Sequence, residues 1–128
     1  MERKRVSTGT EWEPVVGYSR AVRVDDEVHV SGTTATDADG EVVGVGDPRT
    51  QTEQAIANVE SALEEAGATL SDVVRTRLYV TDIDDWEAIG RAHGEAFGDV
   101  RPATSMVQVE QLIDPAFLVE IEATARVD

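Results

Sequence analysis

The sequence has 128 residues, of which 41% are hydrophobic, so it is long enough to bury a core, and we expect a single domain over residues 1–128. It contains no cysteine, which excludes thiolate nucleophiles, disulfides and thiolate metal sites, and its two histidines are too few for a multi-histidine metal site. No apolar run is long enough to cross a membrane, and no apolar segment follows the basic N-terminal residues as in a secretory signal. We therefore expect a cytoplasmic protein that binds no metal and inserts into no membrane.

The net charge is strongly negative, with 26 acidic residues against 11 basic ones and a formal charge of −15. Lys4 is the only lysine. Such a charge opposes the compact state by self-repulsion, whereas salt of about 1 M shortens the Debye length to roughly 3 Å. The composition predicts a halophilic protein, with an ordinary acidic protein as the alternative. It disfavours binding to nucleic acid and to anionic membranes.

The first half of the chain is predicted to form a hairpin, a loop and a helix. Residues 1–17 look irregular. Alternating patterns predict strands over 18–24 and 27–31, joined by a turn at Asp25-Asp26. Residues 32–49 are expected to form a loop with a short strand at 41–43. Apolar residues on one helical face predict a helix over 50–66, which Gly67 ends.

The second half is predicted to add a strand, a helix and two more strands. The strand spans 73–81, with Val74, Thr76, Leu78 and Val80 on one side. A helix over 83–97 places Trp86, Ile89, His93 and Phe97 on one face. Two final strands are expected over 105–112 and 117–127, with a turn near Asp114-Pro115.

The element order is therefore β-β-α-β-α-β-β, an α+β arrangement. Right-handed crossovers would place both helices on one face of a mixed sheet. Two helices leave the opposite face bare, and a bare face that carries Val and Leu predicts a homo-oligomer.

Alternation in the last strand puts two carboxylates, Glu120 and Glu122, on this bare face. A carboxylate near a subunit interface is costly unless it is paired, hydrated or used. The spacing alone favours a salt bridge between subunits, to Arg77 or Arg126, over a general base.

Other candidates for ligand contacts also fit a structural role. The loop 101–105 carries the hydroxyls of Thr104 and Ser105, which can bind a carboxylate or carbonyl or serve the turn. Ser31-Gly32 allows a close backbone approach to a ligand, and Tyr18 is either a site residue or a half-buried aromatic.

Two side chains of the second predicted helix have polar groups that could contact a ligand. His93 is more often a packed, hydrogen-bonded histidine than a catalyst, and Arg91 is more often a solvated arginine. His29 gives no sharp hypothesis.

Together these segments resemble the Rid family, also called YjgF/YER057c/UK114 and formerly endoribonuclease L-PSP. The resemblance extends from about Tyr18 to Ala125 and is most specific in its last two segments. The matching segments are Gly17-Tyr18, Val28-His29-Val30-Ser31-Gly32, Gln54–Gly67, Asp72–Thr76, Tyr79–Asp82, Arg101–Thr104 and Val119–Ala123.

The resemblance implies a chorismate-mutase-like fold assembled as a homotrimer with three clefts between subunits, and no cofactor. It also implies hydrolysis of 2-imino acids, or their enamine tautomers, to 2-keto acids and ammonia. In the family, a glutamate corresponding to Glu120 positions or activates water, and an arginine holds the substrate carboxylate. A tyrosine and a Ser-Gly backbone, matched by Tyr18 and Ser31-Gly32, complete the cleft.

The sequence departs from the family pattern at the arginine, where Thr104 stands instead. Arg91 occupies a position that usually holds a small polar residue, and Met106 one that is often cysteine. Losing a charge-assisted contact costs about 1.5–3 kcal/mol per bond. Either Arg91 or Arg101 supplies the cation, or the substrate has no carboxylate beside the imine.

Three functions follow, in decreasing order of support. The first is an imine or enamine deaminase whose substrate preference is altered by Thr104, with Glu120 catalytic and with Tyr18, Ser31, Gly32, Arg91, Thr104 and Ser105 binding substrate. The second is a non-catalytic trimer that binds a metabolite in the same clefts. Ribonuclease activity is the least supported, because a charge of −15 repels RNA.

Overall fold

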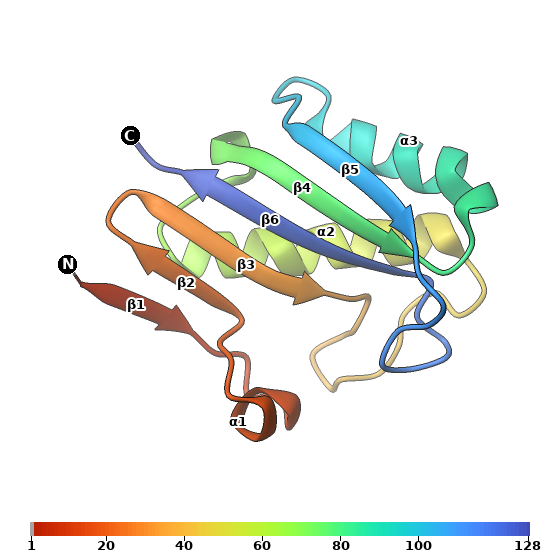
Figure 1. Ribbon diagram of the computed structural model, residues 1–128, viewed down its shortest axis with the longest axis horizontal. Helices are drawn as coiled ribbons and strands as arrows, with labels where there is room; N and C mark the ends of the chain where they lie inside the picture. Colours follow the sequence, from red (N-terminus) through yellow and green to blue (C-terminus); the bar gives the residue numbers. More distant parts are fainter. Residues whose placement is uncertain (1) are drawn as a thin grey trace.

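The computed structural model describes residues 2–128, which form a six-stranded mixed sheet with two long helices on one face (Figure 1). The strands are β1 (Arg3–Val6), β2 (Ala21–Val24), β3 (Glu27–Thr33), β4 (Val73–Val80), β5 (Ala103–Gln108) and β6 (Val119–Arg126). The helices are α1 (Trp12–Val16), α2 (Pro48–Glu65) and α3 (Trp86–Phe97), with short 3₁₀ helices η1 (Leu70–Asp72) and η2 (Ile83–Asp85).

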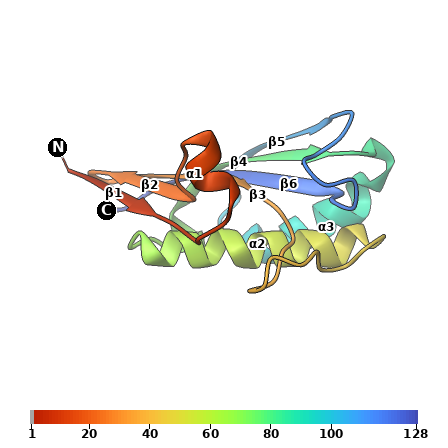
Figure 2. The ribbon, with the colours of Figure 1, turned by 90° about the horizontal axis from the view of Figure 1, so that it is seen from below.

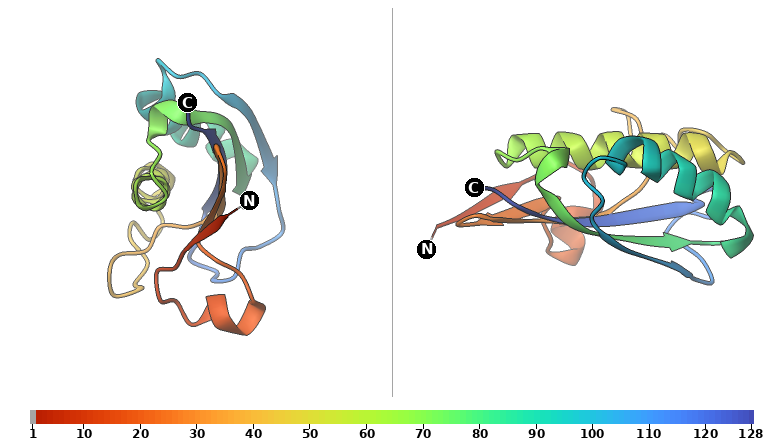
Figure 3. Two further views of the ribbon diagram at one scale, coloured as in Figure 1. Left: turned by 90° about the vertical axis from the view of Figure 1, so that its left-hand side faces the viewer. Right: turned by 90° about the horizontal axis from the view of Figure 1, so that it is seen from above.

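The strand order in the sheet is β1-β2-β3-β6-β4-β5. β4 and β5 run parallel, and every other neighbouring pair in residues 2–128 is antiparallel. Both α2 and α3 lie on the same side of the sheet, as predicted (Figure 2). Apart from the short α1, the other side carries no helix in the described chain (Figures 2 and 3). We call this second side the open face.

The core lies between the sheet and the helices. α2 is capped by Asp47, whose carboxylate accepts a hydrogen bond from the Thr50 amide, and Pro48 occupies its first turn. Val59 and Leu63 of α2 are buried in one core cluster with Ile121 and other residues of β6. The predicted alternation in β6 is confirmed, because its odd-numbered positions from 119 to 125 are buried on the helix side.

The N-terminal region differs from the prediction, because residues expected to be irregular form β1 and α1. β1 pairs with β2 from Arg3 opposite Val24 to Val6 opposite Ala21. Only Val6 of this strand is buried, so its sequence lacks the alternation that marks a strand. Pairing with β2, which is remote from it in sequence, therefore defines β1.

Several predicted boundaries also shift. Tyr18 precedes β2 instead of opening it, and the strand expected at 41–43 is one isolated bridge between Thr36 and Val42. β5 ends at Gln108, so it is shorter than predicted. None of the helices in residues 2–128 is long and apolar enough to cross a membrane.

Two side chains predicted to share buried faces are exposed. Val74 is 47% exposed because an irregularity between Val73 and Arg75 shifts the register of β4 against β6. Trp86 is 59% exposed because it starts α3 immediately after η2, at the end of the helix.

Candidate functional site

The open face carries a cluster where β3 meets β6. A Cβ atom added to Gly32 would lie 2.6 Å from Oε2 of Glu120, so the Glu120 carboxylate rests directly on the backbone of this glycine. The pairing of β3 with β6 is irregular between Val30 and Thr33, and this bulge contains Gly32. Glycine is therefore needed here because the Glu120 side chain occupies the space of a Cβ atom.

Arg20 organises the same cluster. Its Nη1 donates to the Gly32 carbonyl at 2.6 Å and to Thr33 Oγ1 at 3.0 Å, and its Nη2 donates to the Tyr18 hydroxyl at 3.0 Å. The guanidinium carbon also lies 5.4 Å from the centre of the Tyr18 ring. Arg20 thus ties Tyr18 to the bulge of β3.

The surroundings of Glu120 raise the pKa of its carboxyl group above the ordinary value. The main cause is burial, followed by the negative charge of Glu122, while the positive charge of Arg20 acts in the opposite direction. A carboxylate whose pKa is raised is a stronger base, which suits it to accept a proton from water near neutral pH.

Glu122 lies next to this cluster and is already partnered within the chain. It accepts a hydrogen bond from the Tyr79 hydroxyl at 2.5 Å and lies 3.8 Å from Nη1 of Arg77. Arg126, the other partner considered for these carboxylates, pairs with Asp26 at 2.8 Å. Glu120 and Glu122 therefore have different environments although they are two positions apart on one strand.

Thr104 belongs to a second group of residues, at the edge of the sheet that β5 forms. Its Oγ1 lies 2.7 Å from Oγ1 of Thr76, which in turn lies 2.9 Å from Nε2 of His93. Thr104 also donates to the Pro102 carbonyl at 3.2 Å. The His93 ring stacks on Phe97, with 4.6 Å between ring centres. Burial lowers the pKa of His93, so the imidazole is neutral near pH 7.

Thr104 and Glu120 lie on opposite faces of the sheet. Thr104 pairs in register with Thr76, which is buried on the helix side, whereas Glu120 pairs with Tyr79 on the open face. Ser105 follows Thr104 in β5, so its side chain points the other way and accepts a hydrogen bond from Arg75 at 2.9 Å. Thr104 and Glu120 of one chain therefore cannot contact the same small ligand, and Thr104 and Ser105 do not act as a pair.

The two arginines considered as replacements for the missing family arginine lie outside both groups. Arg91 is exposed and pairs with Glu87, one turn earlier on α3, at 2.8 Å. Arg101 is exposed in the turn before β5 and has a positive φ of 52°.

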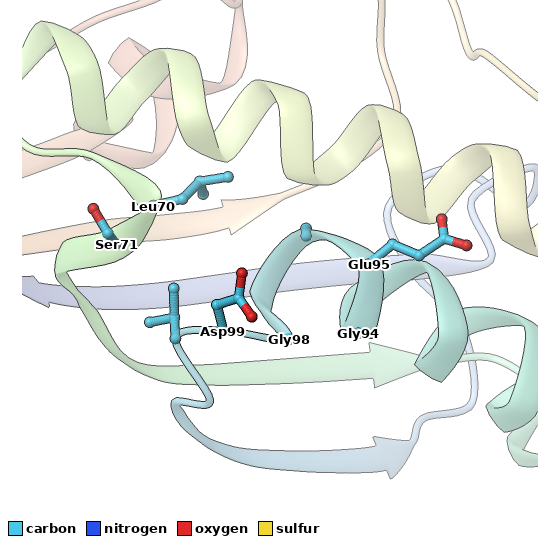
Figure 4. A pocket seen from close by; sticks show the side chains of 8 residues that line it. Leu70, Ser71, Gly94, Glu95, Gly98 and Asp99 are labelled. Atoms are coloured by element: carbon cyan, nitrogen blue, oxygen red, sulfur yellow. The ribbon is translucent and has the colours of Figure 1, made fainter.

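Of two surface hollows, one lies away from the Glu120 cluster and the other borders Glu122 beside it. One, of about 460 Å³, lies between η1 and the C-terminal end of α3 and includes Ser71, Glu95 and Asp99 (Figure 4). Glu95 is engaged there by Arg49 of α2. The other hollow, of about 210 Å³, lies on the open face and includes His29, Arg75 and Arg77.

Arg20 and Thr76 were not identified as site residues from the sequence. Arg20 could have been identified, because it lies two residues after Tyr18 and therefore on the same side of an extended chain. Thr76 could not, since it occupies a core position in an alternating strand.

Comparison with known proteins identifies the family. The profile of the family described as Endoribonuclease L-PSP matches residues 8–127. A crystal structure of a YjgF/YER057c/UK114 family member from Mycobacterium tuberculosis has a TM-score of 0.90 and 52% identity, over 98% of this chain and 100% of that chain.

Two curated relatives are similar over most of their length. An uncharacterised protein of Streptomyces coelicolor is 41% identical over 122 residues, which cover 95% of this chain and 90% of that protein. The 3-aminoacrylate deaminase RutC of Acinetobacter baylyi is 36% identical over 114 residues, which cover 89% of this chain and 90% of RutC. The chain therefore belongs to the endoribonuclease L-PSP family, also known as the YjgF/YER057c/UK114 or Rid family.

Proposed function

We propose that this protein is a Rid-type deaminase that hydrolyses reactive imines or enamines to carbonyl compounds and ammonia. The observation that carries the proposal is the Glu120 carboxylate, half-buried on the open face against the Gly32 backbone and near Arg20. The similarity to a 3-aminoacrylate deaminase supports this class of reaction.

Glu120 is the general base in the proposed reaction. The carboxylate accepts a proton from a water molecule as the water oxygen bonds to the imine carbon. The protonated carboxyl group returns this proton to the nitrogen, which gives a carbinolamine. The carboxylate then takes the hydroxyl proton of the carbinolamine and passes it to the same nitrogen, so that the C–N bond breaks and ammonia leaves as the carbonyl forms. Each turnover consumes one water and regenerates the carboxylate.

We propose that the cleft is completed by a neighbouring subunit of a homotrimer. Because Thr104 and Glu120 of one chain lie on opposite faces of the sheet, both can reach one substrate only if they come from different copies. Exposed apolar side chains such as Val74 and Val107 support contacts between copies.

Release of ammonia and keto acid tests the deaminase. The candidate substrates are 2-iminobutanoate, 2-aminoacrylate and 3-aminoacrylate, each generated in situ in molar salt. Wild-type protein should accelerate hydrolysis, and Glu120→Gln should lose about 10²- to 10⁴-fold in rate, the range typical of a general base. Glu64→Gln removes the same charge from an exposed position on α2 and is the matched control.

A wild-type protein that adds nothing to the uncatalysed rate of any of these compounds would overturn the proposal. Thr104 favours the second candidate in that case, a trimer that binds a metabolite without turnover. A ligand retained in native mass spectrometry, together with the absence of turnover, would support this alternative.

A further inference from the structure

A chain of hydrogen bonds links a histidine beneath the sheet to the surface of β5. His93 Nε2 lies 2.9 Å from Thr76 Oγ1, which lies 2.7 Å from Thr104 Oγ1, which lies 3.2 Å from the Pro102 carbonyl oxygen. Thr76 is 0% exposed, so water cannot replace either of its partners, whereas Thr104 is exposed. The proposed hydrolysis gives no role to His93 or Thr76.

Counting the protons gives this series of hydrogen bonds a direction. Each hydroxyl has one proton, and the Pro102 carbonyl can only accept. If Thr104 donates to Pro102, Thr76 must donate to Thr104, and His93 Nε2 must donate to Thr76. In the opposite direction Thr104 donates to Thr76 and Thr76 donates to His93, which leaves two oxygens facing each other at Pro102 without a proton between them. Only the outward direction makes a hydrogen bond of all three contacts.

We propose that His93 is a positioning residue that, through Thr76, fixes the Thr104 hydroxyl as a hydrogen-bond donor toward the substrate. This inference rests on the proposed function in one respect, which is that Thr104 faces the ligand. The last bond of the chain, to Pro102, is the longest of the three. A ligand oxygen can therefore take over this proton at little cost.

The direction of these hydrogen bonds defines the ligand group that Thr104 can bind. A donor polarised by two preceding hydrogen bonds suits an oxygen acceptor, such as a carboxylate or carbonyl oxygen, and does not suit an N–H group. The substrate should thus present an oxygen where the family arginine would bind a carboxylate, and it should be held there by one neutral hydrogen bond.

The position of the His93 proton is the direct test. Nitrogen-15 NMR distinguishes a ring protonated on Nε2 from one protonated on Nδ1. We expect the Nε2–H form in the neutral wild-type protein. A ring protonated on Nδ1, with Nε2 accepting, would overturn the inference whether or not the protein is an enzyme.

Two variants of the buried threonine provide the functional test. Thr76→Val removes the hydroxyl and should raise KM for a carboxylate-bearing imine by about two- to tenfold, the value of one hydrogen bond, with a smaller change in kcat. Thr76→Ser keeps the hydroxyl and should retain the wild-type KM.

A higher KM with little change in kcat in Thr76→Val, reversed in Thr76→Ser, would support the inference, whereas a wild-type KM in Thr76→Val would overturn it. If wild-type protein releases no ammonia from any imine, the proposed function fails, and the His93 tautomer alone decides this inference.

Discussion

At the scale of single residues, the functional contrast is between Glu120 and Glu122. Both point to the open face of β6, but Glu122 is held by Tyr79 and Arg77, whereas burial and the charges of Glu122 and Arg20 act on Glu120. Glu120 is therefore the carboxylate that we propose as the general base. Alternation along the strand could identify the two carboxylates but could not distinguish them, because the difference depends on Tyr79 of β4 and on Arg20, which precedes β2.

The charges beside Glu120 predict two opposite shifts of its pKa. Arg20→Gln removes a positive charge, so the pKa of Glu120 should rise and the acid limb of kcat/KM should move to higher pH. Glu122→Gln removes a negative charge, so the pKa should fall and the limb should move to lower pH. Carbon-13 NMR titration of Glu120 measures the pKa directly, and shifts of equal sign in the two variants would contradict this account.

At the scale of elements, the bulge of β3 sets the position of Glu120. Gly32→Ala would place a Cβ atom 2.6 Å from the carboxylate oxygen, so the side chain must move. We expect at least a roughly tenfold loss of deaminase activity, because a small misplacement of a catalytic group costs this much or more. Circular dichroism should show a folded protein.

Gly94→Ala is the matched control for this substitution. A Cβ atom at Gly94 would meet nothing within 4 Å, and the residue lies inside α3. Activity should stay at the wild-type level and stability should rise by up to about 1 kcal/mol. Equal activity in the Gly32 and Gly94 variants would mean that the bulge does not position Glu120.

The elements that could be predicted from the sequence are those whose apolar residues recur with the period of a helix or a strand. The helix side of β6 and the buried face of α2 follow from apolar spacing alone. α1 could not be found in this way, because it presents Val15 and Val16 to the surface. Its buried residue, Glu13, accepts hydrogen bonds from three hydroxyl groups in the preceding loop, a contact that spacing does not encode.

At the scale of the whole molecule, the open face connects charge with assembly. A subunit with a formal charge of −15 repels its copies, and salt of about 1 M screens this repulsion to within roughly 3 Å. The proposed clefts should therefore form in concentrated salt and be lost on dilution into low salt. Sedimentation velocity across a salt series measures this, and a monomer at every salt concentration would contradict the proposed trimer.

Mixing two inactive variants tests whether each cleft is shared between subunits. Glu120→Gln removes the base, and Thr104→Trp should block the opposite wall with a bulky side chain. Because Glu120 and Thr104 lie on opposite faces of one sheet, a shared cleft takes each residue from a different copy.

A trimer re-formed from an equal mixture of the two variants then has both native residues in about a quarter of its clefts, since each of the two subunits required has an even chance of being present. The mixture should regain a matching share of deaminase activity on transfer from low to molar salt, while each variant alone stays inactive. No recovery in mixed trimers, verified by mass spectrometry, would place both residues in sites within single subunits, which the geometry of the sheet opposes.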